Sequence, residues 1–78
     1  MNENQGKHRE EHYKGFLYSW IEPPLPGVGF QMNIGSETAS LHELLDASET
    51  ERPNFQTLEE AKEDARRAID TALARAGR

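Results

Sequence analysis

Residues 57–76 have the sequence TLEEAKEDARRAIDTALARA, and this stretch decides the fold. Its apolar residues recur every three or four positions, which is the spacing of one face of an α-helix. Most of them are alanine, so the helix can approach a sheet closely. We therefore predict an amphipathic helix whose buried face consists of Phe55, Leu58, Ala61, Ala65, Ala68 and Ile69. The solvent face should hold Glu59, Lys62, Glu63 and Arg66.

Both ends of this helix carry termination signals. Thr57 and Glu60 have the spacing of a capping box, in which the Thr57 hydroxyl accepts from the Glu60 amide and the Glu60 carboxylate accepts from the Thr57 amide. Gly77 suits the residue after the last turn, where a left-handed backbone conformation is common. These signals bound the helix at 57–76.

Two strands are predicted before the helix. Residues 13–21 alternate large side chains in the manner of a strand, and residues 28–34 alternate Val, Phe, Met and Ile with small or polar residues. Pro26-Gly27 between them suits a type II turn, because proline fixes φ at the first central position and glycine supplies a positive φ at the second. The pattern indicates an antiparallel hairpin. Its first strand should place Phe16, Tyr18 and Trp20 on one side and Leu17 and Ile21 on the other.

The segment between the hairpin and the helix is ambiguous. In residues 38–47, Leu41, Leu44 and Leu45 have helical spacing, whereas Leu41, Glu43 and Leu45 have strand spacing. We predict a short third strand, because two strands alone are marginally stable, followed by a polar loop at residues 48–54. The fold class is thus α+β, a small antiparallel sheet of two or three strands in β-β-β-α order packed on one C-terminal amphipathic helix. Residues 1–11 should be a disordered tail, and residues 12–78 a single α+β domain.

Composition excludes several classes of function. The chain has 78 residues and no cysteine, so a disulfide framework, a thiolate zinc site and a cysteine nucleophile are excluded. The net charge of −5 disfavours binding to phosphate backbones, which needs clustered lysine and arginine. No apolar run approaches the roughly 20 residues of a membrane span. We expect a cytoplasmic protein without a nucleic-acid or membrane partner.

Two short motifs have plain structural interpretations. His8-Arg9-Glu10-Glu11-His12 matches the H-x-x-E-H pattern, which holds zinc when it lies on a helix, but here it falls in the expected tail. Pro23-Pro24-Leu25-Pro26 fits a PxxP ligand pattern and is also a stiff hairpin loop. No catalytic residue, cofactor site or metal ligand is predicted, and the chain is not expected to be an enzyme.

A contact surface is predicted from the two-sided first strand. One helix can cover only one face of a small sheet, and an apolar patch left outside marks an interaction surface. The predicted surface consists of Leu17, Ile21, Pro24 and Leu25. Its occupant would be an unknown protein partner or a second copy in a weak homodimer. The alternative is a single-stranded nucleic-acid-binding module that stacks bases on Phe16, Tyr18 and Trp20.

The segment Phe55-Gln56-Thr57-Leu58-Glu59-Glu60-Ala61 resembles the strand-to-helix passage of HicB-like domains. It also resembles other small bacterial β-β-β-α proteins of unknown function. The resemblance covers some 15 residues. In HicB-like chains a Pro-Gly turn lies shortly before this helix, whereas here about 30 residues intervene. It implies a sheet-plus-helix fold and an antitoxin-like or regulatory binding role, and no site residue is carried over from it.

Overall fold

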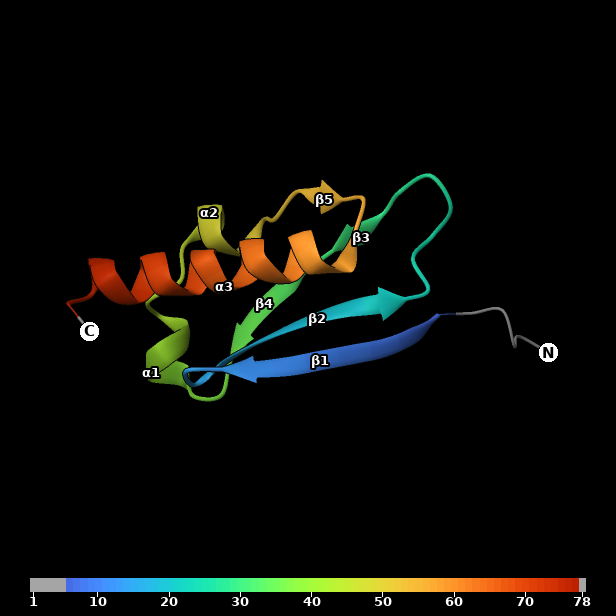
Figure 1. Ribbon diagram of the computed structural model, residues 1–78. Coiled ribbons are helices and arrows are strands. Elements are labelled where there is room, and N and C mark those ends of the chain that lie inside the picture. The colour runs from blue at the N-terminus through green and yellow to red at the C-terminus, as the bar shows by residue number, and fades with distance from the viewer. Residues whose placement is uncertain (1–5, 78) are drawn as a thin grey trace.

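A three-stranded sheet and one long helix form the two main layers of the computed structural model, which describes residues 6–77 (Figure 1). The sheet contains β1 (Lys7–Tyr13), β2 (Phe16–Glu22) and β4 (Asn33–Ser36), in the order β1-β2-β4, and both pairs are antiparallel. Helix α3 (Leu58–Arg75) packs on one face of this sheet. The predicted α+β class is confirmed. The remaining elements are β3 (Phe30–Gln31), α1 (Ala39–His42), α2 (Ala47–Thr50) and β5 (Asn54–Phe55).

Strand β1 corrects the expected N-terminal tail. Residues 7–11, assigned to that tail, belong to β1, while residues 1–5 of the tail lie outside the described residues. The tight turn at Lys14-Gly15 explains the error, because both residues have positive φ (54° and 85°), as a type I′ hairpin requires. This turn folds a charged segment back along β2. Hydrogen bonding to β2, and not the burial of apolar side chains, therefore holds β1. The third strand of the sheet therefore comes from the N-terminal side.

The predicted third strand at 38–47 is wrong. Thr38 caps α1 by accepting from the Leu41 amide at 3.2 Å, and Asp46 and Glu49 form a capping box on α2. Local caps therefore favour two short helices here, and β1 already completes the sheet. The polar loop expected at 48–54 likewise contains part of α2 and of β5. Three leucines of this region pack against the core, namely Leu41, Leu44 and Leu45.

The second predicted strand is divided at Met32. Residues 33–36 pair with β2, with Tyr18 opposite Ile34, whereas residues 30–31 leave β2 and pair with β5. The predicted turn at Pro26-Gly27 is confirmed, since the Val28 amide donates to the Leu25 carbonyl at 3.1 Å and Gly27 has a φ of 77°. Consequently β2 and β3 diverge toward the proline-rich loop, and this divergence positions the site described below.

The core lies between β2 and α3. The three aromatic residues predicted to share one side of the first strand do so and are buried, with Phe16 at 0 %, Tyr18 at 2 % and Trp20 at 5 % exposure. The alanines of α3 allow the close approach that the sequence indicated, while Phe55 and Leu58 are half-buried. The other buried apolar residues are Met32, Ile34, Ala61, Ala65, Ala68, Ile69 and Ala72.

Two side chains predicted on the solvent face of α3 pack instead on the aromatic rings. The Lys62 ammonium lies 5.1 Å from the centre of the Trp20 ring, and the Arg66 guanidinium lies 5.9 Å from that of Tyr18. Lys62 also donates to the Glu11 carboxylate at 2.8 Å, and Tyr18 donates its hydroxyl to the same carboxylate at 2.6 Å. The stems of long basic residues can cover apolar surface while their charges bind elsewhere. This cluster attaches the middle of β1 to α3.

One of the two hydrogen bonds of the predicted capping box is present at the N-terminus of α3. The Thr57 hydroxyl accepts from the Glu60 amide at 3.2 Å, as predicted. The Glu60 carboxylate, however, accepts from that hydroxyl at 3.2 Å and not from the Thr57 amide as predicted. At the other end, Arg75 donates to the buried Glu49 carboxylate at 2.7 and 2.9 Å, which ties α2 to the last turn of α3.

Acid is expected to unfold the chain through its paired carboxylates. The hydrogen bond from Arg75 lowers the pKa of Glu49 below its ordinary 4.5, and the one from Lys62 lowers the pKa of Glu11. A lowered folded-state pKa gives a contribution that is complete above the unfolded-state pKa and is lost as pH falls through the folded-state value. Denaturant titrations should therefore show a free energy of unfolding that declines as pH falls below about 4.5. A Glu49→Gln variant should decline less steeply, and an equal decline would contradict this assignment.

Candidate functional site

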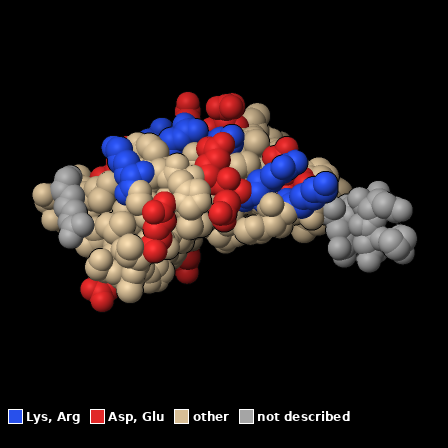
Figure 2. Space-filling view, turned by 90° about the horizontal axis from the view of Figure 1, so that it is seen from below, with Lys and Arg blue, Asp and Glu red and all other residues tan. Residues whose placement is uncertain are grey.

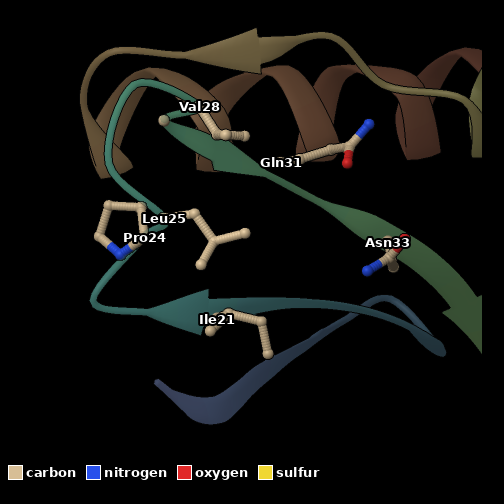
Figure 3. A pocket seen from close by; sticks show the side chains of 7 residues that line it. Ile21, Pro24, Leu25, Val28, Gln31 and Asn33 are labelled. Atoms are coloured by element: carbon tan, nitrogen blue, oxygen red, sulfur yellow. The ribbon is translucent and has the colours of Figure 1, made fainter. Parts of the chain in front are cut away.

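A groove opens on the face of the sheet where β2 and β3 diverge. It has a volume of about 130 Å³ and is lined by Ile21, Pro24, Leu25, Val28, Gly29, Gln31 and Asn33. Figure 3 shows Ile21 on β2, Pro24 and Leu25 on the loop, and Gln31 and Asn33 on the opposite strands. The Leu25 side chain extends into the space between the two strand directions. The groove is thus apolar at the loop and polar along β3 and β4.

The apolar end consists of side chains that a folded core would normally cover. Ile21 is 42 %, Leu25 66 % and Val28 44 % exposed, and these are the exposed large hydrophobic residues among residues 6–77. Exposed apolar residues that stand singly need no explanation, whereas a contiguous group indicates a contact surface. Since all three line the same groove, they form such a group.

The wall opposite β2 is held by the β3–β5 pair. The Asn54 side chain donates to the Val28 carbonyl at 2.9 Å. Gly29 has a φ of 86°, and a Cβ placed on it would lie 2.5 Å from the Phe55 carbonyl oxygen, so a glycine is required for this close approach. The Gln31 carboxamide donates to the Arg52 carbonyl at 3.2 Å, which fixes one of the two polar groups of the groove. The groove is therefore built on a supported backbone.

Three of the four residues predicted for the contact surface meet in this groove. Ile21, Pro24 and Leu25 line it, whereas Leu17 is half-buried farther along β2, and a Cβ placed on Gly35 would lie 3.7 Å from its side chain. The residues missed by sequence reasoning are Val28, Gly29, Gln31 and Asn33. Val28 was predicted to begin a strand, but it lies in the turn before β3 begins. The adjacent Pro26-Gly27 turn was the signal that could have found it.

The groove has the capacity of one side chain. A cavity of about 150 Å³ holds a benzene molecule, whereas sites for cofactors and drug-sized ligands occupy roughly 300–1,000 Å³. At about 130 Å³ the groove fits a branched aliphatic or single-ring group and not a nucleotide. Primary carboxamides such as Gln31 and Asn33 can donate to and accept from a peptide backbone. The lining thus combines the chemistry for an apolar side chain and for the peptide group that carries it.

The H-x-x-E-H motif lies on a strand and not on a helix. His8 and His12 are four residues apart on β1, which corresponds to about 13 Å along a strand, too far to share one metal ion. His12 lies 2.7 Å from Glu37 and 3.4 Å from Glu10, and the hydrogen bond to Glu37 raises the pKa of His12. Among residues 6–77 no group of three or more metal-binding side chains is placed to hold an ion.

The aromatic residues of β2 are covered by α3 and are not available to stack on bases. Their exposure of 5 % or less places Phe16, Tyr18 and Trp20 in the core. Figure 2, which views the molecule from the side where β1 runs, shows basic and acidic side chains interleaved without a patch of one sign. A single-stranded nucleic-acid site needs stacking platforms in a positively charged groove. The described surface in this view has neither feature.

Comparison with known proteins identifies no relative. No protein-family model, curated protein or solved structure matches this chain. Between residues 6 and 77, none of the helices has the length and apolar character needed to cross a bilayer.

Proposed function

We propose that this chain is a cytoplasmic protein–protein interaction module whose groove receives one apolar side chain from an extended segment of a partner protein. The observation that carries the proposal is the convergence of Ile21, Leu25 and Val28, all partly exposed, on a single groove. Burying a leucine-sized side chain there would contribute about 1.5–3 kcal/mol. The absence of cysteine supports the reducing compartment.

The polar end of the groove favours an extended peptide as the occupant. Gln31 and Asn33 stand two residues apart on β3 and β4, and both line the groove beside its apolar end. A peptide whose apolar side chain entered beside Leu25 would bring its own amide groups toward these carboxamides. Binding through one anchor residue and a few backbone hydrogen bonds should be weak, with a dissociation constant of the order of 10–100 μM.

We propose further that this interaction module has a regulatory, antitoxin-like role. Support for it comes from the resemblance of residues 55–61 to HicB-like domains, whose role is to bind a partner protein. Base stacking on the β2 aromatics is not proposed, because α3 covers those rings.

Selection from a displayed library of extended peptides tests the proposed function. The wild-type chain should enrich peptides that share one Leu, Ile, Met or Phe at a fixed position. Leu25→Asp should lower the affinity for an enriched peptide by at least about tenfold, because it places a charge at the apolar end of the groove. The affinity is measured by fluorescence anisotropy of the labelled peptide.

Stability measurements distinguish loss of the site from loss of the fold. Leu25 is 66 % exposed, so Leu25→Asp should change the free energy of unfolding by less than about 0.5 kcal/mol. Glu63→Ala, on the exposed face of α3, should leave both stability and peptide affinity unchanged. Enrichment of peptides without a shared apolar residue, or undiminished binding by the folded Leu25→Asp variant, would refute the proposal.

A further inference from the structure

Strand β1 forms an open edge of the three-stranded sheet. Within residues 6–77 it pairs with β2 alone, and at the opposite edge of the sheet β4 contacts α1 and α2. Five of the seven β1 side chains are exposed, and none of them is apolar. An unpaired strand edge presents a row of backbone donors and acceptors to another strand. The question is which strand the β1 edge fits.

The register of the sheet shows which backbone groups face outward. The Glu37 amide donates to the Gly15 carbonyl at 2.9 Å, so the odd-numbered residues of β2 bond toward β4 and the even-numbered ones toward β1. Tyr18 and Trp20 therefore exchange hydrogen bonds with Glu11 and Arg9. The alternate residues of β1 direct their N–H and C=O groups away from the sheet, and these residues are His8, Glu10 and His12.

The order of charges along β1 is complementary to itself in the antiparallel direction. The sequence Lys7-His8-Arg9-Glu10-Glu11 has its basic residues first and its acidic residues last. A second copy running antiparallel brings the basic half of one strand against the acidic half of the other, whereas a parallel copy would place like charges together. Opposite charges in directly facing positions each contribute about 0.2–1 kcal/mol.

We propose that two copies of this chain associate through antiparallel β1 strands, with Arg9 of one copy facing Arg9 of the other. In this register Lys7 faces Glu11 and His8 faces Glu10, and the two-fold axis repeats both pairs. Each His8–Glu10 pair exchanges two backbone hydrogen bonds, since both residues point outward. The two facing Arg9 side chains repel each other, and this repulsion is offset because each is long enough to reach the diagonal Glu11 of the other copy. The result is a continuous six-stranded sheet with both α3 helices on the same face.

The neighbouring register is less favourable. With Glu10 facing Glu10, the charge pairs equal those of the first register in number, because Arg9 faces Glu11 twice. His8, however, faces His12 and loses the hydrogen bond that its ring N–H can donate to a facing Glu10 carboxylate. The net charge of −5 on each copy opposes association at any register, so the dimer should be weak. This interface involves β1 and is independent of the proposed groove, since none of its residues lines that groove.

Single-cysteine variants test the register directly, because the chain has no cysteine of its own. Facing residues in a non-hydrogen-bonded antiparallel pair have Cα atoms about 4.5 Å apart, which suits a disulfide. In glutathione redox buffer, Arg9→Cys should form crosslinked dimers at least about tenfold faster than Glu10→Cys or the helix control Glu63→Cys. Fastest crosslinking at another β1 position would overturn the register, and equal rates at all positions would overturn the interface.

Sedimentation equilibrium with a charge swap provides the second test. The wild type at hundreds of micromolar should exceed its monomer mass of 8.9 kDa, and His8→Glu should weaken the dimer about three- to tenfold because it sets a second carboxylate opposite Glu10. The double variant His8→Glu/Glu10→Lys should restore it, and Leu25→Asp should leave it unchanged. A strictly monomeric wild type, a stronger His8→Glu dimer, no rescue by the double variant, or loss of the dimer in Leu25→Asp would each refute the β1 interface.

Discussion

Phe16→Ala is expected to lower the free energy of unfolding by about 3–5 kcal/mol, the range for removing a buried phenylalanine ring. Phe16 is 0 % exposed at the start of β2 and belongs to the cluster that packs under α3. A domain of this size has a total stability of roughly 4–12 kcal/mol. The variant should therefore be largely unfolded at moderate denaturant concentrations, as measured by circular dichroism in a urea titration.

Phe55→Ala is the matched control for this substitution. Phe55 lies in β5 at the edge of the same cluster and is half-buried, so less of its ring leaves the core when it is truncated. Phe55→Ala should therefore lower the free energy of unfolding by clearly less than Phe16→Ala does. Equal costs, or a Phe16→Ala cost below about 1 kcal/mol, would mean that the core does not lie between β2 and α3.

Ile69→Ala is expected to cost about 2–4 kcal/mol. Ile69 is the largest apolar residue on the buried stripe of α3, and its exposure is 0 %. Because the rest of the stripe is mostly alanine, its neighbours are too small to fill the cavity that the substitution leaves. The measurement is the midpoint of urea unfolding followed by Trp20 fluorescence, since Trp20 lies in the same core cluster.

Ile21→Ala removes the same atoms from the surface. Ile21 is 42 % exposed, so its truncation should cost less than about 1 kcal/mol. Because the same residue type is truncated in both variants, the difference between their losses of unfolding free energy measures the effect of burial. If both variants lost the same stability, α3 would not pack on the sheet through Ile69.

Helix α3 could be predicted from the sequence because its determinants are local. The alanine stripe, the Thr57 cap and Gly77 all lie within residues 57–77, and the helix follows them closely. The aromatic side of β2 was likewise predicted, since alternation within one strand is also local.

Strand β1 was missed because the side-chain contacts that hold it to α3 are distant in sequence. Glu11 is satisfied by Lys62 on α3, and Tyr13 donates to Asp70 at 3.0 Å. Neither contact leaves an apolar pattern in the charged segment 7–13. The signal that was present is the Lys14-Gly15 turn, which suits a two-residue hairpin.

Part of the candidate site was predicted from the sequence, and the other part was missed because it depends on distant residues. Ile21, Pro24 and Leu25 could be placed outside the core from the alternation of β2 and the proline-rich loop. Val28, Gln31 and Asn33 join them because the chain changes sheets at Met32, where β3 turns to pair with β5. That change depends on a strand more than 20 residues away, so nothing within 28–34 reveals it.

The most direct test of the groove uses N-acetyl-leucine N-methylamide, which carries one apolar side chain between two peptide groups. In an NMR titration of the ¹⁵N-labelled chain at millimolar probe, we expect saturable shifts at the amides of Ile21, Leu25 and Val28 and at the side-chain NH₂ groups of Gln31 and Asn33. The glycine analogue, which lacks the side chain, should give much smaller shifts. Shifts confined to other residues, or equal shifts with both probes, would contradict the assignment of the groove as a binding site for an apolar side chain.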